Sequence, residues 1–461
     1  MLSHRLIGAA LMVACGVAWP APAAAWLVVD HVAIRGKPGV TTRVLATRMH
    51  LYPGSPVDFA VLKAAEQRLI ESDLFSSVRV FIALPMEEEV RRMYLDDKTY
   101  PVEVVVEAVG KLTWFVFPTA SFGSGDWAGG LAYANQNVLG RDVHLLAAGQ
   151  IGESRSYAFI EYSDPLVAGV PLTYSLTGLY RQEQIRFFVD HKLFMQVPTS
   201  VIGGSGQIGW VLSPHTRAHL GLSARYQTVS PVEALQQDAT ALPYNNTPGA
   251  HRIFLLQFQI QYDDTSAREG LRHGVRVRIK NETSDRYWGS DFDYSKFETL
   301  VELYGRFRWN YPSVIFCGVL DYPTSDRGVP VTELIRVGGP NLRGYLTNEF
   351  HGDTLGSMQA EDQAVLLHLR IPWTPVPFNV AAALFLDAAT LLERHPGGTT
   401  VLPPDSAPPI RSKLKDIHAS FGGGVRVILP GVAIPAFKVD VGYGIDVHSV
   451  GVTISIAGGG T

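Results

Sequence analysis

Cysteine is nearly absent from this chain: Cys15 and Cys317 are the only two among 461 residues. If the N-terminal segment is removed as argued below, Cys317 is left alone and no disulfide can form within the mature protein. A lone thiol on a strand is most often a small buried hydrophobe, so we assign it no chemistry.

Charged residues are also scarce. They make up 18 % of the chain, against about a quarter in typical soluble domains. The formal net charge is only −4. Without a basic excess, the composition does not favour nucleic-acid binding, and without runs of like charge it predicts no solvated tail.

Motifs that carry enzyme chemistry are missing as well. The sequence contains no H-E-x-x-H, no G-x-S-x-G and no paired C-x-x-C, which excludes the common metalloprotease, hydrolase and thiol-redox signatures. The fourteen histidines are scattered without the spacing of metal ligands. We therefore expect neither an enzyme nor a bound metal or cofactor.

Long apolar runs are absent too, since no segment reaches the ~18 uninterrupted residues that a transmembrane helix requires. The closest stretch is VLLHLRIPWTPVPFNVAAALFLDAATLL, which begins at Val365. His368, Arg370 and three prolines divide it. Its pattern predicts two strands in place of one helix.

The N-terminus has the pattern of a cleavable secretory signal over residues 1–25. Arg5 provides the positive charge, an apolar stretch follows, and Ala23–Ala25 forms an A-x-A site. The alternative is a short membrane anchor, but Pro20 and Pro22 interrupt the apolar stretch, which is too short to span comfortably.

What the chain does have is glycine (44) and tyrosine plus phenylalanine (18 and 21), which favour strands, tight turns and aromatic belts. The pattern of residues 26–109 predicts a small α+β domain with elements in the order strand, helix, helix, strand, strand. For the second helix we expect Ser55 as N-cap and Pro56 at the first helical position, with Asp58 three residues after the cap.

From residue 110 to 461 alternation with a period of two dominates. In FLLQFQIQY, every second residue from Phe254 to Tyr262 is apolar and shares one face, with the three glutamines on the other. A soluble sandwich turns such apolar faces inward, whereas a membrane barrel turns them outward around a polar lumen. About sixteen strands of ~9–11 residues, with the signal peptide, favour a sixteen-stranded transmembrane β-barrel.

Connection lengths predict which side of the membrane each loop occupies, because such barrels alternate short periplasmic turns with long external loops. Tight links are expected at NVLGRD, SDPLVAG, SPHT and NYPS. Long ones are expected near 183–200, 228–252, 283–297, 322–361 and 389–416. The stretch VGGPNLRGYL, residues 337–346, then falls in the sixth external loop.

Four stretches together resemble the outer-membrane assembly and two-partner-secretion superfamily typified by BamA, TamA and the TpsB transporters. GSPVDFAVLKAAEQRLIESDLFSSVRV resembles a POTRA domain, and GLAYANQNVLGRD the early strand pair of the surface-antigen barrel. RVGGPNLRGY is similar to the Gly-Gly then Val-Arg-Gly-Tyr signature of the sixth loop, with Leu342 in place of valine. LFLDAAT resembles the Phe-x-Asp strand that faces this loop inside the barrel.

The resemblance implies that the loop folds back into the lumen as a lid. Because Leu384 and Leu386 would face lipid, Asp387 would face the lumen, where Arg343 could meet it in a charge-assisted pair. The sites we expect are a lid motif and its lumen partners: Gly338, Gly339, Arg343, Gly344 and Tyr345 in the motif, and Phe385, Asp387, His368 and Arg370 on the wall. In the family a glutamate usually stands where this chain has His368.

The function that the resemblance implies is insertion or secretion of β-rich polypeptides at the bacterial outer membrane, with the POTRA-like domain in the periplasm. The implied partners are unfolded or extended β-rich clients, outer-membrane lipid and periplasmic chaperones, without nucleic acid. The chain would conduct clients through the barrel or open between its first strand, near 112–121, and its last, near 450–457. A passive pore or structural surface barrel is the alternative from another functional class.

Overall fold

The computed structural model describes residues 27–72, 74–83, 100–111, 113–165, 167, 170–189, 191–234, 247–268, 271–325, 329–370, 377–392, 417–428 and 435–456. Contacts divide the chain into two units, Met1–Lys111 and Leu112–Thr461, two residues from the expected boundary. The expected signal peptide, 1–25, lies outside the described residues. We treat the two units separately.

The N-terminal unit is a four-stranded sheet covered by two helices. The strands lie in the order β2-β1-β4-β3, with β1 and β4 parallel and the other pairs antiparallel. The elements are β1 (Leu27–Lys37), α2 (Thr42–Met49), β2 (Pro56–Val57), α3 (Phe59–Glu71), β3 (Phe75–Ala83) and β4 (Tyr100–Gly110). The predicted order of strands and helices is present, with the short strand β2 added.

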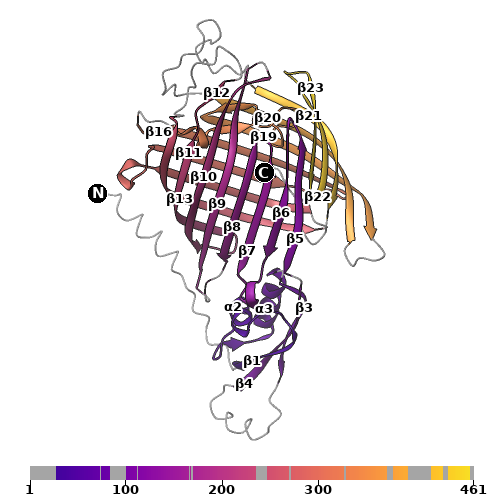
Figure 1. Ribbon diagram of the computed structural model, residues 1–461. Helices are drawn as coiled ribbons and strands as arrows, with labels where there is room; N and C mark the ends of the chain where they lie inside the picture. Colours follow the sequence, from indigo (N-terminus) through magenta and orange to yellow (C-terminus); the bar gives the residue numbers. More distant parts are fainter. Residues whose placement is uncertain are drawn as a thin grey trace, which may run out of the picture. The chain divides into compact units, whose positions relative to one another are not determined.

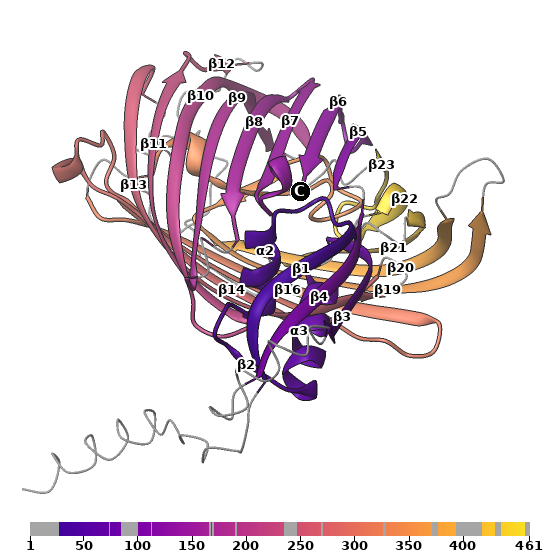
Figure 2. The same cartoon turned by 90° about the horizontal axis from the view of Figure 1, so that it is seen from below.

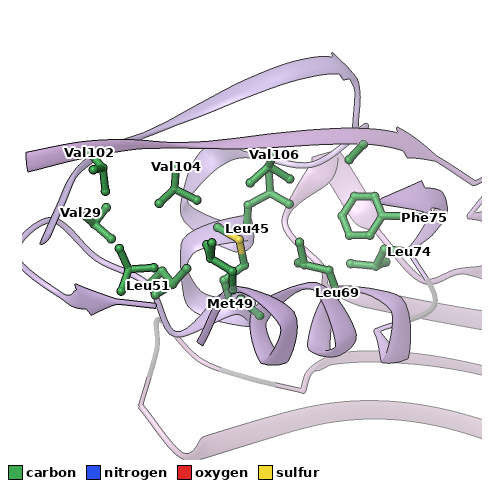
Figure 3. Packing of buried hydrophobic residues seen from close by; sticks show 14 residues of the cluster. Val29, Leu45, Met49, Leu51, Leu69, Leu74, Phe75, Val102, Val104 and Val106 are labelled. Carbon is green, nitrogen blue, oxygen red and sulfur yellow. The ribbon is translucent and has the colours of Figure 1, made fainter. Parts of the chain in front are cut away.

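The core of this unit lies between the helices and the sheet (Figure 3). Leu45 and Met49 on α2 and Leu69 on α3 are fully buried against the valines of β4. Apolar residues at helical spacing point toward one face, and the β-branched residues of the central strand pack well on a pleated surface. This core holds β3 at one edge of the sheet.

The second helix begins later than its sequence indicated. Asp58 is the N-cap, since its Oδ1 accepts a hydrogen bond from the Val61 N–H at 2.7 Å, whereas Pro56 belongs to β2. Ser55 Oγ instead accepts from the Tyr52 N–H at 3.1 Å. The prediction of Ser55 as cap was therefore wrong, because pairing of β2 with β1 keeps residues 56–57 extended.

We expect Asp58→Ala to cost about 1 kcal/mol of α3 stability, because the Val61 amide loses its acceptor. Amide hydrogen exchange in the first turn of α3 should become about fivefold faster. Ser55→Ala is the matched control and should leave these amides unchanged. Equal effects of the two substitutions would contradict the assignment of Asp58 as cap.

Strand β3 forms one edge of the N-terminal sheet, pairing with β4 among the described residues. Part of this edge is occupied from within, because the Val80 N–H donates to Glu66 Oε2 on α3 at 2.8 Å. An unpaired strand edge is a template for another extended chain, and a charged side chain on it limits such pairing. Glu66 thus occupies one of the donor positions that an added strand would use.

The second unit is a closed barrel of sixteen long antiparallel strands, with the two-residue β12 (Glu233–Ala234) beside β10 and β11 (Figures 1 and 2). Its first half comprises β5 (Trp114–Gly123), β6 (Asp126–Asn135), β7 (His144–Gly152), β8 (Arg155–Asp164), β9 (Leu172–Val189), β10 (Lys192–Val211), β11 (Thr216–Val229) and β13 (Gly249–Arg268). Its second half comprises β14 (Leu271–Ser284), β15 (Tyr294–Tyr304), β16 (Asn310–Pro323), β19 (Thr354–Arg370), β20 (Pro377–Leu392), β21 (Ile417–Ile428), β22 (Pro435–Gly444) and β23 (Ser449–Ile456). The fold prediction is confirmed.

The barrel strands turn apolar side chains outward. On β20, Leu384 is 72 % exposed, whereas Asp387 is 0 % exposed on the lumen face. On β13, Phe258 is exposed and Gln257 is buried. This polarity is the reverse of a soluble barrel and is that of a membrane barrel.

One expected long loop is absent. Residues 183–189 and 192–200, predicted as part of a loop, belong to β9 and β10, which pair from Leu172–Trp210 to Val189–Lys192. Connection length indicated a loop here, but both strands continue through this stretch. The expected tight link NYPS instead begins β16 at Asn310.

Among the described residues, no helix is long and apolar enough to cross a membrane. Within the same residues, no group of three or more His, Cys, Asp or Glu side chains could hold a metal ion.

Candidate functional site

The connection between β16 and β19 enters the barrel. It contains the 3-10 turn η3 (Val331–Glu333) and the short strands β17 (Ile335–Val337) and β18 (Phe350–Gly352), which pair with each other. Leu342 and Tyr345, between them, are buried in one cluster with Leu355 of β19 and Ala389 of β20. We call residues 329–353 the lid.

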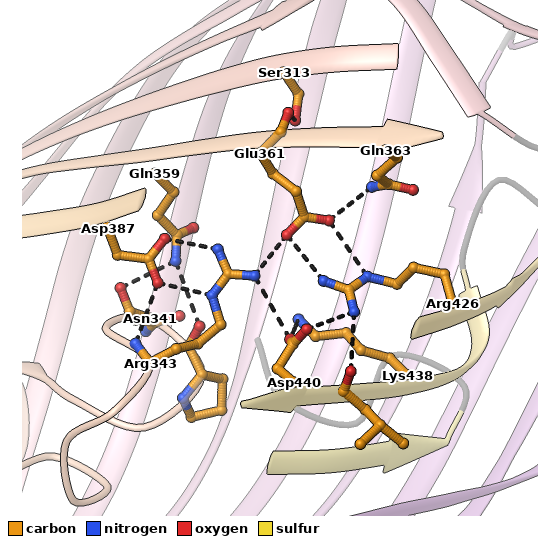
Figure 4. A network of polar contacts seen from close by, with 12 residues as sticks. Ser313, Asn341, Arg343, Gln359, Glu361, Gln363, Asp387, Arg426, Lys438 and Asp440 are labelled. Carbon is orange, nitrogen blue, oxygen red and sulfur yellow. Dashed lines mark hydrogen bonds and ion pairs between the residues drawn. The ribbon is translucent and has the colours of Figure 1, made fainter. Parts of the chain in front are cut away.

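Arg343 at the lid tip forms a bidentate pair with Asp387 on the barrel wall (Figure 4). Its Nε donates to Asp387 Oδ2 and its Nη2 to Oδ1, both at 2.7 Å, and its backbone N–H donates to Oδ2 at 3.2 Å. The guanidinium carbon lies 3.4 Å from the centre of the Phe385 ring. Fork geometry and ring stacking both favour arginine over lysine here.

Two further carboxylates, which sequence reasoning missed, complete the network. Arg343 Nη1 donates to Glu361 Oε2 at 2.5 Å, and Arg426 donates to the same oxygen at 3.0 Å and to Asp440 at 2.5 Å (Figure 4). These side chains come from β19, β21 and β22. The signal for them was strand alternation, because Glu361 lies at the same parity as Gln359 and Gln363.

His368 and Arg370 do not join the described contacts of Arg343. His368 Nδ1 lies 2.8 Å from Asn379 Oδ1, and both of the predicted residues are exposed near the end of β19. A register shift between Val365 and Leu367 changes the parity of this strand end. The carboxylate of β19 that contacts Arg343 is Glu361, seven residues before His368.

Glycines allow the lid tip to lie directly on the wall. Gly344 has φ +97°, and a Cβ there would come within 2.8 Å of the Gly444 nitrogen. A Cβ on Gly442 or Gly451 would in turn meet the lid backbone at 2.9 and 3.0 Å. Backbone therefore packs on backbone, which side chains at these positions would prevent.

Tyr345 extends the lid contact to the turn between β22 and β23. Its hydroxyl donates to Asp446 and lies 2.8 Å from the carbonyl oxygen of Ala419, and its ring meets Phe350 edge-on. Burial, followed by the hydrogen bond to Asp446, raises the pKa of Tyr345. The phenol therefore stays protonated and remains a donor.

The barrel closes through a short seam. Among the described residues, which end at Ile456, β23 and β5 share four residue pairs, from Thr453–Gly123 to Ile456–Ala120. By contrast, eight pairs join β22 to β23 and ten join β5 to β6. Because the number of backbone hydrogen bonds grows with the number of residue pairs, this is the weakest of these three junctions within the described part of the chain.

The lid tip contacts both sides of this seam. Ser449 Oγ, at the start of β23, donates to the Gly344 carbonyl at 2.8 Å. The Thr347 N–H donates at 2.8 Å to the carbonyl of Ser124, in the turn that follows β5. Lid position and seam closure are thus physically linked.

Comparison with known proteins identifies the family. A profile described as the Omp85 superfamily domain matches residues 137–449. No curated protein sequence matches the chain.

Solved structures agree in fold. BamA from Haemophilus ducreyi lacking POTRA domains 1–3 has a TM-score of 0.64 at 16 % identity, covering 93 % of this chain and 84 % of that one. CdiB from Acinetobacter baumannii has a TM-score of 0.57 at 12 % identity, covering 93 % and 74 %. With the profile spanning more than half of its residues, the chain belongs to the Omp85 superfamily.

Proposed function

We propose that this outer-membrane protein moves β-rich polypeptides into or across the membrane. In this proposal the N-terminal unit is a single POTRA-like domain in the periplasm, and the barrel provides the passage. Membership of the superfamily supports a role in protein assembly or secretion. No catalytic step, nucleotide or metal is required.

The edge of β3 that no described strand pairs with supports capture of extended clients. β-augmentation adds a strand through main-chain hydrogen bonds, so it accepts many sequences. α3 packs beside this edge and supplies Glu66 to the Val80 N–H. A client strand would take over this donor, and periplasmic chaperones that carry unfolded chains would deliver to the same edge.

The four-pair seam is the observation that carries the proposal. Exchange of backbone pairing at this junction costs fewer hydrogen bonds than at its neighbours. Six residues of β5, Trp114–Thr119, lie beyond the pairing with the described residues of β23. A client strand could pair there while the barrel opens toward lipid.

The test is reconstitution in liposomes with an unfolded outer-membrane barrel polypeptide as probe. If the protein inserts clients, folded and heat-modifiable probe should appear faster than in empty liposomes. If it secretes them, protease-protected probe should appear faster than in empty liposomes. Steady, large conductance that does not depend on the probe, with no probe crosslinked to the N-terminal unit, would instead establish a passive pore.

Glu66→Ala should increase client binding at the β3 edge, because it frees the Val80 N–H and removes a charge that repels pairing. Crosslinking of an unfolded probe to β3 should rise severalfold. Lys63→Ala, on the same helix, is the matched control. Equal crosslinking in wild type and Glu66→Ala would show that this carboxylate does not limit access.

A further inference from the structure

A second part of the lid docks on a different wall from the tip. Val331 and Leu334, at its beginning, are buried against an apolar cluster that also includes a partly buried Phe194. The buried wall residues of this cluster come from β9, β10 and β11: Ile185, Phe187, Met195, Val197 and Val229. This cluster is separate from the one around Leu342 and Tyr345, which also contains Ile335 and Val337 of the lid.

Two ion pairs accompany this apolar contact. Arg336 forms a bidentate ion pair with Glu183 of β9. Its Nη1 donates to Oε1 at 2.8 Å and its Nη2 to Oε2 at 3.1 Å. Arg225 of β11 donates to Glu333 at 2.8 Å, and Lys296 of β15 donates to the Glu333 carbonyl at 3.1 Å. We call the pairs Arg336–Glu183 and Arg225–Glu333 the root anchor.

Burial makes the root anchor costly to break. The side chains of Glu183 and Arg336 are 2 % and 11 % exposed, and removing one partner of such a pair leaves the other buried charge poorly paired. Arg181 Nε, 3.7 Å from Glu183 Oε2, is a second cation beside this carboxylate. His351 is the ladder partner of Arg336 between β17 and β18. Burial and the nearby Arg336 lower the pKa of His351 to about 4, so it is neutral at pH 7.

The root anchor and the Arg343–Asp387 pair, which we call the tip anchor, lie on opposite walls. Around the ring, the path from β9 to β20 through β10, β11, β13, β14, β15, β16 and β19 is eight steps. The path through β8, β7, β6, β5, β23, β22 and β21 is also eight steps. Arg336 and Arg343 are only seven residues apart in sequence, so this short segment crosses the lumen from wall to wall.

We propose that the lid is a crossbar with two independently bound ends, and that the root anchor keeps the lumen closed when the tip anchor breaks. Release of Arg343 from Asp387 frees one end, while Arg336 and Glu333 still hold the other. Passage of a polypeptide through the centre of the barrel then requires both anchors to break. Closure of the lumen in this way does not depend on whether the protein transports clients.

The experiment is single-channel conductance of the full chain in planar bilayers, using variants that keep side-chain size. Glu183→Gln weakens the root anchor and Asp387→Asn the tip anchor. We expect each single variant to show brief openings. The double variant should hold a steady open state with open time about tenfold above either single variant.

Controls separate the anchors from general damage to the wall. Glu298→Gln removes a lumen carboxylate that pairs with Arg278 at 2.6 Å, away from the described lid contacts, and should leave the pore closed. Combining Glu183→Arg with Arg336→Glu swaps the two charges and keeps an ion pair at the root, so this variant should restore the closure that Glu183→Gln weakens. If the double variant matches Asp387→Asn alone, or if Glu183→Gln alone opens the pore fully, the two-anchor proposal fails.

A reversible crosslink tests whether the root holds the lumen closed, without weakening an ion pair at the root. Thr332 Oγ1 donates to Gln227 on β11, so the thiols of Gln227→Cys with Thr332→Cys should be bridged by a short bis-methanethiosulfonate reagent in a Cys317→Ser background. In an Asp387→Asn variant with this crosslink we expect a closed pore while the crosslink is intact and frequent openings after reduction removes it. Equal openings in both states would overturn the proposal. Because conductance needs no client, this result is separate from the success or failure of client transport.

Discussion

Arg343→Ala should release the lid tip from the wall, with a loss of about 3–5 kcal/mol in docking free energy. The substitution leaves Asp387, which is 0 % exposed, without its bidentate partner and takes a donor from Glu361. Amide hydrogen exchange at Leu342 and Tyr345 should become faster by about two orders of magnitude or more.

Asp387→Ala should produce a loss of similar size, because it breaks the same unit from the other side. The double variant should lose little more than either single variant, as expected for two residues that act together. Glu298→Ala, elsewhere in the lumen, is the control and should leave lid exchange unchanged. Fully additive losses from Arg343→Ala and Asp387→Ala would count against their direct coupling.

Locking the seam should abolish transport. Ser121 on β5 and Ser455 on β23 face each other in the four-pair junction, and antiparallel partners bring Cβ atoms within about 5.5 Å. In a Cys317→Ser background, oxidised Ser121→Cys with Ser455→Cys should reduce insertion of an unfolded barrel probe by at least about tenfold, because a closed disulfide holds the strands together. Reduction should restore it.

The matched control introduces a disulfide at a junction that need not open. Ser121 also pairs with Ala128 of β6, so Ser121→Cys with Ala128→Cys introduces the same chemistry within one hairpin. This variant should insert the probe normally when oxidised. Full activity of the oxidised Ser121–Ser455 staple would show that clients do not use the seam.

Local pattern predicted much of the barrel. Alternation assigned Leu384 to lipid and Asp387 to the lumen, and the exposures on β20 agree. The long loop expected near 183–200 was wrong, because a polar stretch there lies within paired strands. Local pattern also failed at Ser55, because local capping preference could not anticipate that β2 would pair with β1.

The networks around the lid depended on information that a single sequence does not carry. Arg336 and Glu183 are 153 residues apart, and Arg343 meets Glu361 and Asp387 from two different strands. Alternation gives the face of each side chain, but strand register and the path of the lid decide which faces meet. The shift between Val365 and Leu367 shows how one irregularity changes that outcome for His368.

Capture of extended polypeptide by the N-terminal unit is the step that most separates a transporter from a passive barrel. A photo-crosslinking residue placed at Arg79, exposed on the β3 edge strand, tests it in intact cells, with Lys63 on α3 as the control position. We predict crosslinks from position 79 to unfolded β-rich polypeptides in transit, and few from position 63. Absence of such crosslinks from position 79 while clients are being made, or equal yields from both positions, would contradict a polypeptide-transporting function.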